Sequence, residues 1–128
     1  MSDDVGIFRT DVEIESHTRP GETRLLHSVL VDTGAEYSWV PARVLDELGI
    51  EPVKRRLFQQ ADGSVLERAV GFAIIRAGGE TTTDEVVFGG PKDMVLLGAR
   101  SLEGMNLRLD LVARRLIPAG PAPAAAAA

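Results

Sequence analysis

The sequence predicts an all-β fold, a partly closed barrel or folded sheet with about eight short strands and two brief helices. Apolar and polar residues alternate in several segments, and turn signals containing Gly or Pro separate these segments. Only two short stretches have the apolar spacing of a helix. The chain has 128 residues, 45% hydrophobic and 26% charged, which suits a single folded domain.

A hairpin is predicted at the start of the chain. Residues 8–15 alternate between an apolar side and a charged side that includes Glu15. Pro20-Gly21 is a strong turn signal, and the apolar run 25–31 returns from it to Asp32. We therefore expect Asp32 at the end of the second strand.

Two short helices are predicted. Residues 41–49 form a two-turn helix with Pro41 at its first position and Gly49 as its left-handed stop. The apolar run 94–98 ends in glycine, and residues 99–103 after it have the length of one or two helical turns.

A second hairpin is predicted in the middle of the chain. Residues from Val53 onward are strand-like and lead to a tip at Asp62-Gly63. The return strand, residues 65–76, contains Gly71 as a bulge or a close backbone approach. One face of this strand is expected to carry Leu66, Val70, Phe72 and Ile74.

The remaining strands are short. The stretch 81–88 is rich in β-formers, residues 106–111 alternate, and residues 116–117 add a final short strand. Beyond Pro118 the composition is reduced to Ala, Pro and Gly. We place the folded domain at residues 1–118 and an Ala/Pro-rich tail at residues 119–128.

Charge and cysteine content exclude several function classes. The net charge of −5 argues against a nucleic-acid partner and against an anionic membrane surface. The chain has no cysteine, which excludes disulfides and thiolate chemistry and fits a reducing compartment. No signal peptide or membrane span is visible, so a cytoplasmic protein is expected. His17 and His27 are too isolated for a metal site, and no cofactor or metal is expected.

The stretch Val31-Asp32-Thr33-Gly34-Ala35 is the main candidate for function. An unpaired carboxylate at the end of an apolar strand is costly and needs a reason. Catalysis is one such reason. A tight turn, with Thr33 and Gly34 supplying turn chemistry, is the alternative.

The segment Leu30-Val31-Asp32-Thr33-Gly34-Ala35, followed later by Leu96-Leu97-Gly98-Ala99, resembles the retropepsin-like aspartic proteases. In that family the Asp-Thr-Gly turn carries the catalytic carboxylate, and an apolar-apolar-Gly segment packs beneath it. The hairpin with Asp62-Gly63 stands where the family has its flap. The resemblance covers most of residues 5–117.

The resemblance implies an aspartic endopeptidase that hydrolyses extended peptide or protein substrates. Such a site needs two carboxylates that share a proton. The chain contains no second Asp-Thr-Gly or Asp-Ser-Gly, so Asp32 of an identical chain would supply the partner. A homodimer would then be part of the mechanism.

The resemblance also implies roles for individual residues. Asp32 would activate water, Thr33 would bond to its counterpart across the dimer axis, and Gly34 would donate its N–H to a carboxylate oxygen. The active-site floor would consist of Val31, Leu97 and Gly98. Substrate would contact Ala35, Tyr37 and the flap tip Ala61, Asp62, Gly63 and Ser64. Val40 and Leu66 are further candidates for the specificity pockets.

Two features differ from the viral members of this family. Their flap tips are rich in glycine, whereas this tip has only Gly63. Their second motif places Arg directly after its Gly, where it pairs with an acid near the active-site turn. Here Ala99 stands in that place, and Arg100 with Glu36 is the candidate pair.

Two other functions fit the sequence. A retropepsin-fold module could bind peptide or dimerise without cutting. A β-barrel binding domain unrelated to proteases would be favoured if two Asp32 carboxylates could not approach each other.

Overall fold

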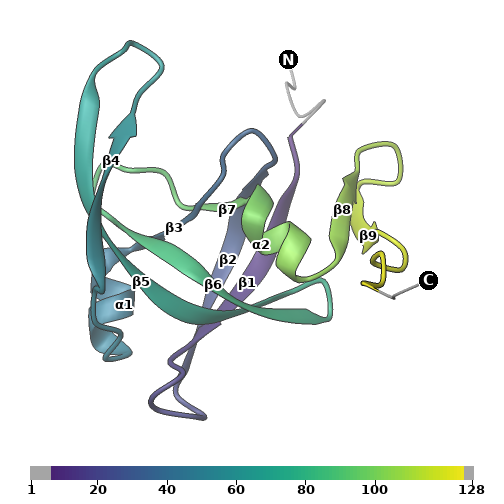
Figure 1. Cartoon of the computed structure of the whole chain (residues 1–128), viewed down its shortest axis with the longest axis horizontal. Helices are drawn as coiled ribbons and strands as arrows, with labels where there is room; N and C mark the ends of the chain where they lie inside the picture. Colours follow the sequence, from purple (N-terminus) through teal and green to yellow (C-terminus); the bar gives the residue numbers. More distant parts are fainter. Residues whose placement is uncertain (1–6, 126–128) are drawn as a thin grey trace.

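The computed structural model describes residues 7–125, which form a mostly β structure with two short helices (Figure 1). The all-β prediction is confirmed. The strands of the described part are β1 (Arg9–Glu15), β2 (Thr23–Asp32), β3 (Ser38–Pro41), β4 (Lys54–Gln59), β5 (Val65–Ala77), β6 (Glu80–Gly89), β7 (Leu96–Gly98), β8 (Leu107–Asp110) and β9 (Arg115–Pro118). The helices are α1 (Ala42–Glu47) and α2 (Ala99–Gly104).

Six strands close into a barrel. They follow the order β1-β2-β7-β3-β6-β5, and an additional pairing of β1 with β5 joins the two ends. Strand β4 pairs with β5 outside this ring, so the β4–β5 hairpin extends beyond the barrel (Figure 1). Strands β8 and β9 form a separate two-stranded sheet near the other end of the molecule.

Strand β3 was not predicted as a strand. It has only four residues, too few for alternation to identify it. It is formed by parallel pairing with β6 and a single antiparallel pair, Trp39 with Leu96 of β7. Both partners lie far away in the sequence, so long-range pairing rather than local propensity decides this element.

Two apolar clusters hold the fold together. The main cluster fills the barrel with side chains from β1, β2, β5, β6 and both helices. The smaller cluster contains Tyr37, Val70 and Val87, with Trp39 and Phe58 packed against it. It lies against the base of the β4–β5 hairpin, because Phe58 belongs to β4 and Val70 to β5.

The two clusters explain why the face of β5 predicted to carry the apolar residues is not the face that points into the barrel in the second half of the strand. The barrel interior receives Ala73, Ile75 and Ala77, whereas Phe72 is 40% exposed. Val70 is buried, but in the small cluster on the opposite face. Apolar residues occupy both faces here, so alternation alone cannot identify the interior one.

Gly71 marks the predicted close approach of two backbones. A Cβ atom at this position would lie 2.8 Å from the carbonyl oxygen of Glu51. Any side chain larger than hydrogen would therefore push β5 away from the segment that precedes β4.

Glu15 also departs from the prediction, since it was expected on the exposed side of β1 and is only 8% exposed. Its carboxylate accepts hydrogen bonds from the backbone N–H of Gly21 and from Arg76. The Gly21 bond lowers the pKa of Glu15 most, followed by the Arg76 bond. These partners explain why a carboxylate can be buried at the end of the first hairpin.

The two helices occur where they were predicted. Pro41 is not the first helical residue, however, but the last residue of β3 and the N-cap of α1. Gly49 has a φ of +71°, as expected for a left-handed stop. Helix α2 begins directly after Gly98, so it is attached to the strand that pairs with Asp32.

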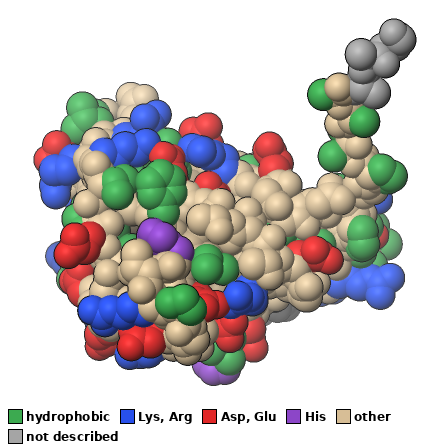
Figure 2. All heavy atoms as spheres, turned by 60° about the horizontal axis from the view of Figure 1, so that its bottom comes forward, with side chains coloured by type: hydrophobic (Ala, Val, Ile, Leu, Met, Phe, Trp, Pro, Cys, Tyr) green, Lys and Arg blue, Asp and Glu red, His purple; other side chains and the backbone are tan. Residues whose placement is uncertain are grey.

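The first residues after β9 are hydrogen-bonded to Asn106. Ala119 donates its N–H to the Asn106 carbonyl, and the Asn106 side chain donates to the carbonyl of Gly120. The last described residues stand away from the body, whose visible face mixes acidic and basic side chains (Figure 2). Within residues 7–125, none of the helices has the length and apolar character needed to cross a membrane.

Candidate active site

Asp32 is the last residue of β2, and this end of β2 pairs in parallel with β7. Val31 lies opposite Leu97, and Asp32 lies opposite Gly98. Both Val31 and Leu97 are buried in the main cluster. The three residues expected to form the floor are therefore directly adjacent to the Asp32 turn.

The turn after Asp32 orients its carboxylate. Oδ1 accepts the N–H of Gly34 at 2.9 Å, and the Asp32 carbonyl accepts the N–H of Ala35 at 3.2 Å. The side chain is partly exposed. Within residues 7–125, Oδ2 has no hydrogen-bond donor, so one oxygen is fixed and the other can bind water.

Helix α2 holds the loop that follows the turn. The N–H groups of Ala99 and Arg100 donate to the carbonyls of Ala35 and Glu36, at 2.8 and 3.1 Å. The approach is close, because a Cβ on Gly98 would lie 2.5 Å from the Tyr37 carbonyl oxygen. Only glycine fits at this position.

The side chain of Arg100 does not pair with Glu36 in this structure. Its guanidinium lies 3.1 Å from Glu85 and 4.0 Å from Asp84, both on β6. The contact between Arg100 and Glu36 runs through the backbone alone. Lys54 also binds Glu85, at 2.6 Å, and its hydrogen bond is the largest cause of the lowered pKa of Glu85.

A buried chain of hydrogen bonds connects the site to Asp84. The N–H of Gly98 donates to Ser38 Oγ at 3.0 Å, and Ser101 Oγ donates to Asp84 at 2.9 Å. The two hydroxyl oxygens are 2.6 Å apart. Since the single Ser101 proton goes to Asp84, Ser38 donates to Ser101. This arrangement satisfies two fully buried hydroxyl groups, and it was not foreseen from the sequence.

A cavity of about 660 Å³ opens beside Asp32. The predicted site residues that line it are Asp32, Gly34, Ala35, Tyr37, Ala61 and Leu66. Thr33 lines a second, smaller pocket with Ala99, Arg100 and Glu103. Val40 is buried in the main cluster, so its expected role in a specificity pocket is wrong.

The tip of the β4–β5 hairpin is a turn held by its own residues. Asp62 accepts the backbone N–H of Ser64 at 2.9 Å and its hydroxyl at 2.6 Å, and the hydroxyl bond lowers the pKa of Asp62 most. Gly63 has a φ of +88°, as the predicted turn requires. Asp62, Gly63 and Ser64 are exposed and do not line the cavity.

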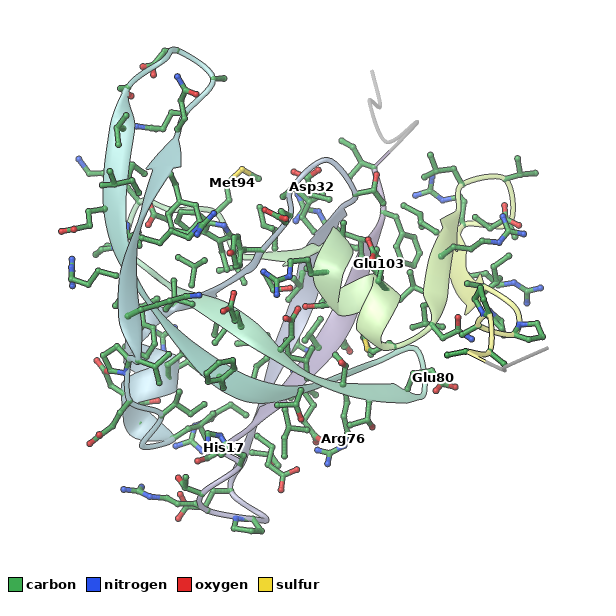
Figure 3. All side chains as sticks on the ribbon, in the orientation of Figure 1. His17, Asp32, Arg76, Glu80, Met94 and Glu103 are labelled. Carbon is green, nitrogen blue, oxygen red and sulfur yellow. The ribbon has the colours of Figure 1, made fainter. Side chains whose placement is uncertain are left out.

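Several residues that line the cavity were not predicted from the sequence. The aromatic rings of Trp39 and Tyr37 each contact Phe58 edge-on, with centroids 5.0 and 5.5 Å apart. The other missed lining residues include Arg56, Leu57, Lys92, Met94 and Leu96. Met94 and Asp32 point to the same open side, beside the hairpin (Figure 3). Alternation along β4 places Arg56 and Phe58 on one face, and this signal could have identified them.

In the part of the chain that the structure describes, no three His, Cys, Asp or Glu side chains are close enough to hold a metal ion.

Comparisons with known proteins agree with this geometry. The family model "gag-polyprotein putative aspartyl protease" matches residues 24–104. The solution structure of simian foamy virus (mac) protease is similar, with a TM-score of 0.50 and 22% sequence identity. The match covers 74% of this chain and 91% of the viral chain, and it confirms the predicted retropepsin-like fold. A search of curated proteins gives no match.

Proposed function

The chain belongs to the gag-polyprotein putative aspartyl protease family, and on this premise we propose that it is an aspartic endopeptidase that acts as a homodimer. One observation carries the proposal. Asp32 is partly exposed and lines a cavity of about 660 Å³, with one oxygen held by Gly34 and, within residues 7–125, no donor on the other. Family membership also removes the interpretation of a β-barrel unrelated to proteases.

The chemistry requires a second carboxylate. Aspartic proteases are the standard example of two carboxylates that share one proton, so that one acts as base and the other as acid. One chain offers a single Asp-Thr-Gly, and the second Asp32 would come from another copy across a two-fold axis. The ionised Asp32 would take a proton from water as the water attacks the peptide carbonyl. The protonated Asp32 would donate its proton to the carbonyl oxygen.

The neighbouring residues would support these steps. Val31, Leu97 and Gly98 form a buried floor that keeps bulk water from the carboxylates. Gly34 orients the carboxylate, and Thr33 is exposed, where it could bond to its counterpart in the second copy. These roles agree with the positions of the residues.

Substrate would lie between the catalytic turn and the β4–β5 hairpin. Ala35, Tyr37 and Ala61 line the cavity, so they would contact a bound peptide directly. The exposed tip residues Asp62, Gly63 and Ser64 would reach the substrate only after the hairpin closes.

The direct test is cleavage of an unstructured protein at mildly acidic pH. We expect cleavage by the wild type and a loss of at least about 100-fold for Asp32→Asn, because the base and the shared proton are both removed. Asp46→Asn is the matched control, since Asp46 is exposed on α1 and does not line the cavity. Equal cleavage by the wild type and Asp32→Asn would contradict the proposal.

A mixing experiment tests the homodimer separately. Wild type and Asp32→Asn are mixed in equal amounts and allowed to exchange subunits. Random exchange leaves about a quarter of the dimers with two Asp32 carboxylates. Activity should then fall to about half of that of the wild-type protein present alone. Unchanged activity after exchange would mean that one chain is sufficient. A verified dimer that cleaves nothing over a broad pH range would instead favour a silent peptide-binding or dimerisation module.

A further inference from the structure

Two basic side chains in the cavity wall form no ion pair with the residues that the structure describes. Arg56 on β4 and Lys92, in the loop between β6 and β7, both line the cavity. Neither forms a salt bridge within residues 7–125. Most other basic residues nearby are paired, as Arg55 is with Glu67 and Lys54 with Glu85. The cavity wall therefore carries two basic groups that form no ion pair within residues 7–125.

Arg56 is held in place by an aromatic ring. Its guanidinium lies 5.4 Å from the ring centroid of Tyr37, and that of Arg100 lies 4.9 Å from the same centroid. Tyr37 is buried, and Arg100 is fixed by its salt bridge to Glu85. A guanidinium stacked on a ring keeps its N–H groups available at the edge, where they can bind a carboxylate with two hydrogen bonds.

Lys92 lies in a loop that is also anchored. Arg68 on β5 binds the neighbouring residue Asp93 with two hydrogen bonds, 2.7 and 3.1 Å long. Asp93 additionally accepts the N–H of Gly90 at 2.7 Å, which closes the loop on itself. Both partners of the Arg68–Asp93 pair are shielded from solvent, and Arg68 lowers the pKa of Asp93 most. The backbone that carries Lys92 is therefore fixed before any ligand binds.

Several large apolar side chains also belong to the cavity wall. Trp39, Phe58, Leu66 and Leu96 lie around the cavity with Arg56 and Lys92. Partial exclusion of water by these side chains strengthens the attraction between a bound carboxylate and the two basic groups. Glu36 lines this cavity and also the second pocket, next to Thr33. Arg56 and Lys92 line this cavity but not the second pocket. The other acidic lining residues are Asp32 at the Asp-Thr-Gly turn and Asp93, which is paired with Arg68.

We propose that this cavity selects peptides that carry a glutamate or aspartate beside apolar residues, with Arg56 binding the carboxylate and Lys92 adding a second positive charge. The proposal rests on the proposed function, because it names the substrate class of the same site. The protein as a whole is acidic, with a net charge of −5, so the attraction is local to the cavity and does not come from the overall field.

The test uses pairs of peptides that differ only by Glu or Gln at one position within an otherwise apolar sequence. Binding is measured by fluorescence anisotropy at about pH 6.5, where glutamate is ionised. Asp32→Asn protein is used, so that no peptide is consumed. At one position we expect the Glu peptide to bind about tenfold more tightly than the Gln peptide. Added salt should reduce this preference.

Three variants locate the effect. Arg56→Gln should reduce the preference to less than about twofold, and Lys92→Gln should reduce it partly. Arg55→Gln is the matched control, because Arg55 is the adjacent residue on β4, pairs with Glu67 and does not line the cavity. It should leave the preference unchanged. Equal binding of Glu and Gln peptides at every position, or an equal loss in Arg55→Gln, would overturn the proposal.

Cleavage by the wild-type protein separates this inference from the proposed function. A binding preference without any cleavage would support the inference and contradict the protease. Cleavage that depends on Asp32 but is indifferent to the acidic residue would contradict the inference alone. The absence of both would contradict both.

Discussion

The Asp32 turn and the hairpin tip at Asp62 share one local hydrogen bond and have very different surroundings. In each, an aspartate Oδ1 accepts the N–H of the residue two positions later at 2.9 Å. The Asp62 turn is otherwise held by bonds among residues 60–64 and is exposed. The Asp32 turn is held by β7, α2 and a buried chain of hydroxyl groups. The turn itself is therefore ordinary, and distant packing makes one of the two a candidate active site.

Glycine substitutions should show the largest contrast between the two turns. Gly98→Ala places a Cβ 2.5 Å from the Tyr37 carbonyl and should destabilise the fold by about 3 kcal/mol or more. Gly63→Ala meets nothing within 4 Å, and its positive φ should cost only about 1–2 kcal/mol. Urea unfolding of both variants measures the difference. Similar losses of stability would mean that movement of the loop can make room for the Cβ in Gly98→Ala.

Serine substitutions should give the next largest difference. Ser101→Ala leaves the Ser38 hydroxyl without its buried acceptor, at a cost of about 1–3 kcal/mol. Ser64→Ala at the exposed tip should stay within about 0.5 kcal/mol of the wild type. The free energy of unfolding measures both. A Ser101→Ala protein as stable as the wild type would show that the hydroxyl chain adds nothing to the support of the turn.

The salt bridge between Lys54 and Glu85 predicts that the free energy of unfolding depends on pH. Glu85 also pairs with Arg100 of α2, the helix that supports the Asp32 turn. The pKa of Glu85 is lowered in the folded protein, chiefly by its bond to Lys54. Its contribution is therefore present above the unfolded pKa of about 4.3 and is lost as the pH falls through the lower folded value. Lys54→Met should be less stable at pH 7 by up to about 1 kcal/mol, discounted because Lys54 is 43% exposed. The deficit should shrink in urea unfolding below about pH 4. A deficit independent of pH would assign it to packing instead.

The smallest expected effect concerns Asp62. Its pKa is lowered by the hydroxyl and the N–H of Ser64, so Ser64→Ala should raise it toward its ordinary value. A titration of the Asp62 carboxyl resonance by NMR measures this change. The global stability should barely respond, because Asp62 and Ser64 are exposed and their bond lies within the turn itself. An unchanged pKa would show that the backbone bond alone sets it.

The local elements of this fold could be predicted from the sequence, and most of the site's supports could not. Alternation and turn signals located β1, β2, the β4–β5 hairpin, β6 and both helices. Glu15 was assigned to the wrong environment because its partner, Arg76, lies on a strand far along the chain. Alternation could not identify which face of β5 points into the barrel, because two clusters compete for its apolar residues.

The same limit applies within the site. Asp32 could be identified because its turn is a contiguous motif that resembles a known family. The link from Ser38 to Ser101 joins residues from opposite halves of the chain, and either serine alone looks like a surface residue. Alternation places Arg56 beside Phe58 on one face of β4, but that Arg56 and Lys92 share a cavity depends on how β4 and the β6–β7 loop are placed.

The pairing of β2 with β7 also sets an order of events during translation. Asp32 is synthesised early, but the strand and helix that support its turn, residues 96–104, are synthesised near the end of the domain. Closing so long a loop is slow compared with forming a hairpin. A nascent chain that has not yet released these residues from the ribosome therefore holds an aspartate without its supporting strand and helix, and the proposed hydrolysis would have to wait until they have emerged and folded.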